Sequence, residues 1–434
     1  MTLIPLDNRL GETVLTGRHD SGLRVTLVPK DEFSKTFGVF ATNFGSVDDR
    51  FFDPRRGEEI AVPDGVAHFL EHKMFEDERG DVSDRFSALG AQSNASTGFT
   101  TTSYIYSTTE HRDECLSLLL DFVQEPHFTP ELVAKEQGII GQEIRMYDDD
   151  PSWRIFFQLL EALYRRHPVR INIAGTEESI AGIDPDVLTA CHAAFYRPAN
   201  MSLTLVGRLD PGRVVELIEE DLRARPAGPP TPHRRTPVED GPIVRRHVRL
   251  EMDVARPKLL LGWKDAVLGG DGVDLVRREV VSGLALELLF GRSSPVHEAL
   301  YDEGVIDDSF GAEYTGEFDF GFVTVGGDTD EPDRLEARLR EEVERFRGGE
   351  VDPADFERVR NKLLGKFVGM FDSIESVAYA FSGGSFRDVT PFETVELLQT
   401  VRPEEVAARA REMFDDDLSA RSDLVPRAAD GVGR

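Results

Sequence analysis

The chain has 434 residues, of which 40% are hydrophobic, and a formal net charge of −30 at pH 7. This length exceeds one ordinary domain, so we expect two or three domains with sizeable cores. The acidic excess argues against nucleic acid as a partner, because phosphate backbones would be repelled. Two cysteines provide no disulfide framework, and no apolar stretch is long enough for a membrane span. We therefore expect a cytoplasmic protein without a membrane segment or signal peptide.

The first elements are two strands and a helix. Alternating hydrophobic residues predict strands at 23–29 and 37–44, and near-helical apolar spacing predicts a helix over 65–75. Asp64, after Pro63, is the expected N-cap of that helix. Its apolar residues indicate that the helix is partly buried.

That helix contains the run His68-Phe69-Leu70-Glu71-His72. Imidazoles four positions apart on a helix project from one face and can bind one metal ion. Glu71 falls on the same side, where it could act on a bound water. The alternative is two surface histidines on an amphipathic helix, but a partly buried helix would solvate unpaired imidazoles poorly.

Further along, the pattern predicts a strand at 103–107, an amphipathic helix at 110–124 and another helix after Thr129. Thr129 is a natural N-cap, and Pro130 fits the first helical position. The third helix is expected to bury an apolar stripe: Leu132, Ile139, Ile140 and Met146.

Two acidic residues on that helix, Glu136 and Glu143, are two turns apart and face the same way. Such a pair can simply be a solvated face. However, a site with two histidines and an open water position typically takes one carboxylate. The pair therefore contains a candidate third ligand.

A proline-rich linker at 226–242 divides the chain into expected domains at 1–225 and 243–434. In the second half we expect strands at 247–250, 259–263 and 318–326. We expect helices at 275–289 and 335–347.

The halves also align at one place, which suggests a duplicated unit. Residues 128–132 match 351–355, and counting onward places Lys366 opposite Glu143. The second half contains no H-x-x-E-H, so we expect one metal site per chain.

H-x-x-E-H followed by Glu-x6-Glu resembles the insulinase/pitrilysin family of zinc metallopeptidases, the inverzincins. Four segments resemble in particular a bacterial branch found as paired genes and labelled as associated with elongation factor P 5-aminopentanol modification: 65–76, 90–95, 135–151 and 167–169. The resemblance implies an α+β fold of two homologous domains. Each would be an antiparallel sheet with helices packed mainly on one face.

Carried over residue by residue, the resemblance implies zinc held by His68, His72 and Glu143. Glu71 would be the general base that activates the zinc-bound water, and Glu136 would support the site. These roles make the chain a metalloendopeptidase, a hydrolase acting on peptides or small unfolded proteins. The alternative is a maturation or assembly factor that acts mainly as a binding scaffold.

In relatives, a strand beside the zinc binds the substrate peptide as an added strand. Asn94, Ala95 and Thr97 stand at the matching positions here. The alternative is an edge strand with only a structural role.

The chain departs from the family pattern at one place. Many relatives carry an Arg/Tyr pair in the second half, and this pair is thought to stabilise the oxyanion. Leu300 and Asp307 stand at those positions here. We therefore expect a homologous, zinc-free partner subunit that supplies the pair in a heterodimer. A homodimer, or other groups of this chain, are the alternatives.

Overall fold

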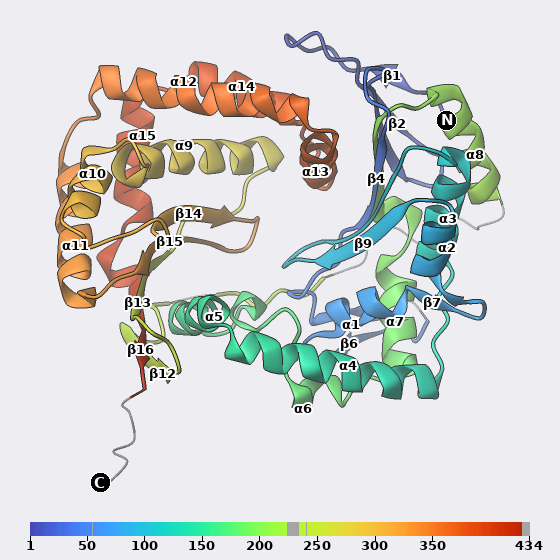
Figure 1. The fold of residues 1–434 in the computed structure, drawn as a ribbon, viewed down its shortest axis with the longest axis horizontal. Helices are drawn as coiled ribbons and strands as arrows, with labels where there is room; N and C mark the ends of the chain where they lie inside the picture. Colours follow the sequence, from blue (N-terminus) through green and yellow to red (C-terminus); the bar gives the residue numbers. More distant parts are fainter. Residues whose placement is uncertain (54, 224–233, 240, 428–434) are drawn as a thin grey trace. The chain divides into compact units, whose positions relative to one another are not determined.

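The structure is a computed structural model that describes residues 1–53, 55–223, 234–239 and 241–427 (Figure 1). Most of the expected linker at 226–242 lies outside these residues. The chain forms two compact units, each assembled from separate stretches of sequence. The first unit comprises Met1–Ile144, Asn172–Thr236 and Val368–Phe392, and the second comprises Arg145–Ile171, Pro237–Phe367 and Glu393–Arg434.

The first unit contains a seven-stranded sheet in the order β1-β2-β3-β11-β4-β10-β9. Its strands are β1 (Ile4–Pro5), β2 (Leu15–Arg18), β3 (Arg24–Pro29), β4 (Thr36–Thr42), β9 (Gln92–Thr97), β10 (Thr102–Thr108) and β11 (Met201–Gly207). Two small hairpins pair β5 (Arg50–Asp53) with β6 (Glu58–Ala61) and β7 (Glu76–Asp77) with β8 (Gly80–Asp81). Every residue of β4 and β11 is buried, so these central strands form the core of the unit.

The helices that belong to this unit wholly or in large part come from both halves of the sequence. They are α1 (Val66–Lys73), α2 (Val82–Ala88), α3 (Arg112–Gln124), α4 (Pro130–Asp149), α6 (Glu177–Ile180), α7 (Pro185–Phe195), α8 (Pro211–Arg223) and α13 (Ile374–Ser385). Short 3-10 turns lie at η2 (Pro198–Asn200) and η3 (Met370–Asp372).

The second unit contains a five-stranded sheet in the order β12-β16-β13-β15-β14. Its strands are β12 (His247–Met252), β13 (Lys258–Lys264), β14 (Gly311–Gly316), β15 (Gly321–Asp328) and β16 (Ser419–Pro426). Its helices are α5 (Pro151–Leu163), α9 (Gly272–Phe290), α10 (Pro295–Asp302), α11 (Pro332–Gly348), α12 (Pro353–Gly369), α14 (Pro391–Thr400) and α15 (Pro403–Met413), with 3-10 turns at η1 (Pro168–Arg170) and η4 (Asp416–Leu418).

The two sheets share one topology. In each half, the five main strands taken in chain order are arranged first-fifth-second-fourth-third, as β3-β11-β4-β10-β9 and as β12-β16-β13-β15-β14. The first and fifth strands run parallel in both sheets, and the other neighbours are antiparallel. The predicted α+β class is therefore confirmed, with one parallel pair in each otherwise antiparallel sheet.

Each sheet is covered by a helix from the other half of the sequence. Helix α5, from the first half, packs on β12, β13 and β16 of the second unit, where Leu159 lies against Gly262. A Cβ at Gly262 would come within 2.8 Å of the Leu159 side chain, so glycine permits this close approach. Helix α13, from the second half, packs on β3, β4 and β11 of the first unit. The two compact units therefore do not coincide with two continuous halves.

Two local expectations were wrong. The N-cap of α1 is Gly65 with φ of 87°, not Asp64, because the chain passes so close to Ala174 that a Cβ would lie 2.4 Å from its carbonyl oxygen. In the predicted stripe of α4, Ile139 and Met146 are 44% and 61% exposed. The buried residues of α4 lie on a different side of the helix from Ile139 and Met146. They are Val133, Glu136, Ile140, Gly141 and Ile144.

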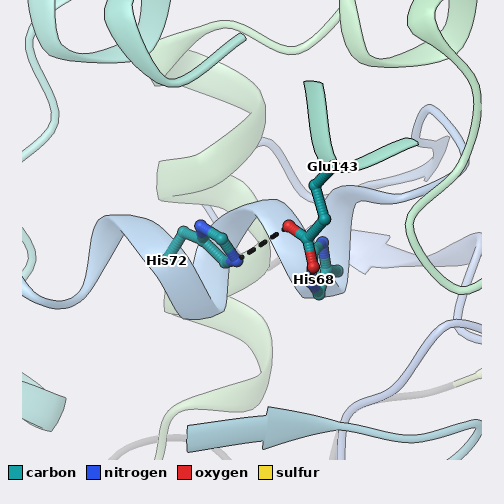
Figure 2. Close-up of side chains that lie close together, drawn as sticks. All are labelled: His68, His72 and Glu143. Atoms are coloured by element: carbon teal, nitrogen blue, oxygen red, sulfur yellow. Dashed lines mark ion pairs between the residues drawn. The ribbon is translucent and has the colours of Figure 1, made fainter. Parts of the chain in front are cut away.

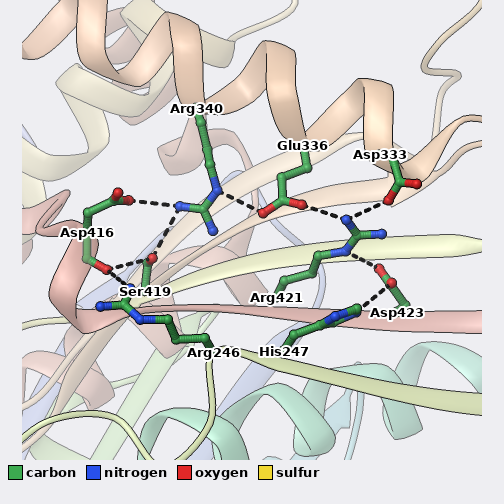
Figure 3. A network of polar contacts seen from close by, with 9 residues as sticks. All are labelled: Arg246, His247, Asp333, Glu336, Arg340, Asp416, Ser419, Arg421 and Asp423. Carbon is green, nitrogen blue, oxygen red and sulfur yellow. Dashed lines mark hydrogen bonds and ion pairs between the residues drawn. The ribbon is translucent and has the colours of Figure 1, made fainter.

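A network of charged residues ties α11 to the sheet of the second unit (Figure 3). Arg421 on β16 contacts Asp423 at 2.7 Å and Glu336 of α11 at 2.5 Å. Glu336 also accepts from Arg340, and His247 of β12 contacts Asp423 at 2.8 Å. Burial raises the pKa of Glu336, but Arg340 and Arg421 outweigh it and lower the pKa. The network thus joins two strands and a helix through paired charges, of which Arg421 and Asp423 are buried.

One carboxylate in the second unit organises the loop after α5. Glu239 accepts hydrogen bonds from the backbone N–H groups of Arg165, Arg166 and His167, at 2.7 to 3.0 Å, and lies 3.4 Å from Lys264. Burial raises the pKa of Glu239, but the three backbone donors and Lys264 outweigh it, so the pKa is lowered.

Replacing Glu239 by glutamine should destabilise the protein at neutral pH by about 1–3 kcal/mol, because one amide oxygen cannot satisfy three donors and a cation. The folded pKa lies below the ordinary 4.5, so this stabilisation is present above about that pH and is lost as the pH falls through the folded value. Denaturant titrations of Glu239→Gln and the parent should therefore differ at pH 7 and converge in acid. A constant difference across the pH range would contradict the assignment.

Candidate metal centre

Helix α1 carries both histidines of the H-x-x-E-H run. His68 and Glu71 are each 8% exposed, and the imidazole of His72 is 27% exposed. The two rings lie with centroids 4.6 Å apart. One turn of α1 therefore presents two imidazoles side by side on a mostly buried helix.

Helix α4 brings a carboxylate to these imidazoles (Figure 2). Glu143 lies with one oxygen 3.6 Å from Nε2 of His68 and the other 3.5 Å from Nε2 of His72. Ligand atoms of the three residues all lie within 4.8 Å of one another. Within the described part of the chain, this is the one group of three or more His, Cys, Asp or Glu side chains close enough to hold a metal ion.

The donor set fits zinc. Ligand atoms about 2.0–2.1 Å from a tetrahedral zinc ion lie roughly 3.4 Å apart, close to the two contacts that Glu143 makes. Two imidazole nitrogens and one carboxylate form a three-ligand set that leaves a fourth position open. The arrangement can therefore hold zinc and still admit water.

The second carboxylate of α4 lies behind the site. Glu136 is 6% exposed and contacts Nδ1 of His72 at 3.1 Å and Nζ of Lys73 at 3.2 Å. Burial raises the pKa of Glu136, but His72 and Lys73 outweigh it and the pKa is lowered. Burial lowers the pKa of His72, but the bond to Glu136 and the nearby carboxylates outweigh it and the pKa is raised. A carboxylate that accepts a hydrogen bond from Nδ1–H of an imidazole keeps the proton on Nδ1 and leaves Nε2 available to a metal.

The structure brings Thr97 to the side chain of Glu71. Its hydroxyl donates to Oε2 of Glu71 at 2.6 Å, so the carboxylate has a fixed partner outside the ligand group. Asn94 and Ala95 lie on the same strand, β9, and pair with β10 on one side only. Because β9 is an edge strand, its other side can accept an added strand.

Sequence reasoning missed Lys73, which follows His72 and is wholly buried. Its ammonium group contacts Glu76 and Glu136. A lysine next to apolar residues, with a glutamate three positions later, was the available signal.

Leu300 and Asp307, at the positions of the missing Arg/Tyr pair, are engaged within the second unit. Leu300 is completely buried in α10. Asp307 accepts from Ser309 and from Arg256, at 2.6 Å, and these contacts lower its pKa. Neither side chain can donate a hydrogen bond to an oxyanion.

The described helices include none with the length and apolar character needed to cross a lipid bilayer.

Comparisons with known proteins identify the family of the chain. A family model described as Insulinase (Peptidase family M16) matches residues 58–177, and one described as Peptidase M16 inactive domain matches residues 182–363. The chain is 41% identical over 422 residues to the uncharacterized zinc protease YmfH of Bacillus subtilis (strain 168), covering 97% of this chain and 98% of that protein. It is 24% identical over 375 residues to the zinc protease PqqE of Helicobacter pylori, covering 83% and 81%.

A solved structure has the same fold. The crystal structure of an M16-like peptidase from Alicyclobacillus acidocaldarius matches with a TM-score of 0.92 and 37% identity, over 98% of this chain and all of that chain. From these matches along nearly its whole length, the chain belongs to the insulinase family, peptidase family M16.

Proposed function

We propose that this chain is a zinc-dependent endopeptidase whose metal is held by His68, His72 and Glu143. The observation that carries the proposal is the convergence of two Nε2 atoms from α1 and one carboxylate from α4, at 3.5 and 3.6 Å. Relatives named as zinc proteases support both the metal and the reaction class.

Zinc, when bound, supplies a Lewis acid that lowers the pKa of water to about 7. Glu71 accepts the proton of the attacking water and delivers it to the departing amide nitrogen. The hydroxyl of Thr97 holds the carboxylate of Glu71 in place through the 2.6 Å bond. Glu136 orients His72 through its Nδ1 atom, so that Nε2 faces Glu143.

The substrates we propose are peptides or small unfolded proteins bound in extended form along β9. An edge strand offers unpaired backbone groups that an extended peptide can bind, which orders the peptide without demanding one sequence. Asn94 and Ala95 would contact that peptide. Thr97 would link the peptide-binding strand to the base, because it belongs to β9 and bonds Glu71.

We further propose that the chain is the zinc-bearing subunit of a cytoplasmic heterodimer. Leu300 and Asp307 provide no oxyanion donor, and a homologous zinc-free subunit with an Arg/Tyr pair would supply one. A homodimer would leave this group missing. The two cysteines are free and buried, which is compatible with a reducing compartment.

A second role, as a maturation or assembly factor that mainly binds its client, uses the same edge strand. A functional link to elongation factor P modification would favour this second role. It requires the fold and β9 but no proton acceptor at Glu71, and this difference makes the two roles separable.

Glu71→Gln should retain stoichiometric zinc and lose peptidase activity by about 10²–10⁴-fold, because the amide cannot accept the proton. Zinc content by mass spectrometry and cleavage of a quenched fluorescent peptide measure the two effects. The same variant should fail to replace the native protein in its host. Full cellular function of Glu71→Gln would instead favour the scaffold role.

Glu143→Ala should weaken zinc binding by at least about 100-fold, because only two protein ligands remain. Gln142→Ala, an exposed neighbour on α4, is the matched control and should keep native zinc affinity. Competition with a chromophoric chelator reports both values. Equal affinity in the two variants would remove Glu143 from the ligand set.

Purification of the tagged protein from its native host should recover a homologous second chain in equal amount. That chain should lack H-x-x-E-H and carry the Arg/Tyr pair, and adding it to this protein should raise peptide hydrolysis. Full activity of this chain alone would contradict the heterodimer.

A further inference from the structure

We propose that Lys73 is a positioning residue of the metal centre, which fixes Glu136 so that Glu136 in turn fixes His72. This inference rests on the proposed function, because it assigns the lysine a role toward the same zinc ion. The ion pairs of Lys73 are with Glu76 and Glu136, neither of which is among the three candidate ligands. It acts through one intervening carboxylate.

The contacts form a ladder of alternating charge that ends at the site, which we call the Lys–Glu ladder. Exposed Lys135 contacts Glu76 at 2.6 Å, Glu76 contacts Lys73, Lys73 contacts Glu136 at 3.2 Å, and Glu136 contacts His72 at 3.1 Å. The ladder thus runs from the surface of α4 through β7 and α1 to the buried face of α4, and it ends at His72 on α1.

The ion pairs of Lys73 differ from surface ion pairs because Lys73 is buried. Its side chain is 0% exposed, and the carboxylate of Glu136 is 8% exposed. Removing an ammonium group from water is unfavourable unless partners compensate its charge. Two carboxylates compensate it here, so both are held at defined positions by one cation.

The electrostatics of the site explain why Glu136 needs that cation. Glu136 and Glu143 both contact the imidazole of His72, at 3.1 and 3.5 Å, so two carboxylates lie around one ring. Like charges repel, so Glu143 disfavours an ionised Glu136 next to His72, whereas the direct contacts of Glu136 with His72 and Lys73 favour it. Without Lys73, Glu136 would lose its direct contact with a permanently charged ammonium group and could turn away from Nδ1 of His72.

A double-mutant cycle tests this relay. Lys73→Met and Glu136→Gln should each weaken zinc binding by about 10-fold, the lower end of the range for residues that support metal ligands. If Lys73 acts through Glu136, adding Lys73→Met to Glu136→Gln should weaken zinc binding no further. Zinc dissociation constants from chelator competition provide the readout, independent of peptidase activity.

Lys135→Met is the matched control, because it removes an exposed lysine that contacts the same Glu76. It should weaken zinc binding much less than Lys73→Met does, because Glu76 keeps its contact with buried Lys73. Lys73→Arg should recover part of the loss of Lys73→Met. The double variant is expected to fold even if Lys73→Met alone does not, because the amide of Glu136→Gln needs no cation.

Two results would overturn the inference. Additive losses in the double variant, or a lowered melting temperature with native zinc affinity in Lys73→Met, would make Lys73 a purely structural ion-pair residue. Absence of zinc binding by the native protein is a different result, which would overturn the proposed function as well.

Discussion

The site depends on how two helices satisfy charges that neither could bury alone. Helix α1 presents two imidazoles and a lysine, and α4 presents two carboxylates seven residues apart. Glu136 contacts His72 and Lys73, while Glu143 lies between the two Nε2 atoms. Since buried charges are costly without partners, these contacts fix the register of α4 along α1. Protein contacts alone therefore hold the three candidate ligands together.

Much of this site could be predicted from local sequence. Helical spacing of four and of seven residues predicts which side chains share a face, and the positions of α1 and α4 follow from apolar periodicity and from Thr129, whose hydroxyl accepts from the backbone of Leu132. That Glu143 would meet His68 and His72 followed only from chemistry and family resemblance, because the two helices are joined by long-range packing.

The features that the sequence analysis predicted wrongly or missed have physical causes. Ile139 and Met146 are apolar but exposed, because the face of α4 that turns inward carries the glutamates as well as aliphatic residues. Gly65 caps α1 because a distant loop approaches it, which local propensity cannot reveal. Lys73 was overlooked because lysines are usually exposed, and only its two acidic partners make its burial tolerable. The parallel pair in each sheet also depends on contacts between strands far apart in sequence.

The exchanged helices α5 and α13 have a consequence for biosynthesis. Domains generally fold as they leave the ribosome, amino-terminal part first. Here β3, β4 and β11 have all emerged long before α13, so the sheet of the first unit stays without this cover until residue 385 is translated. Meanwhile α5 has been made but has no sheet to cover until β12, β13 and β16 appear. The sheets therefore receive these covering helices only late in synthesis, and cutting the gene between its halves would leave each product with one uncovered sheet face and one helix without its sheet.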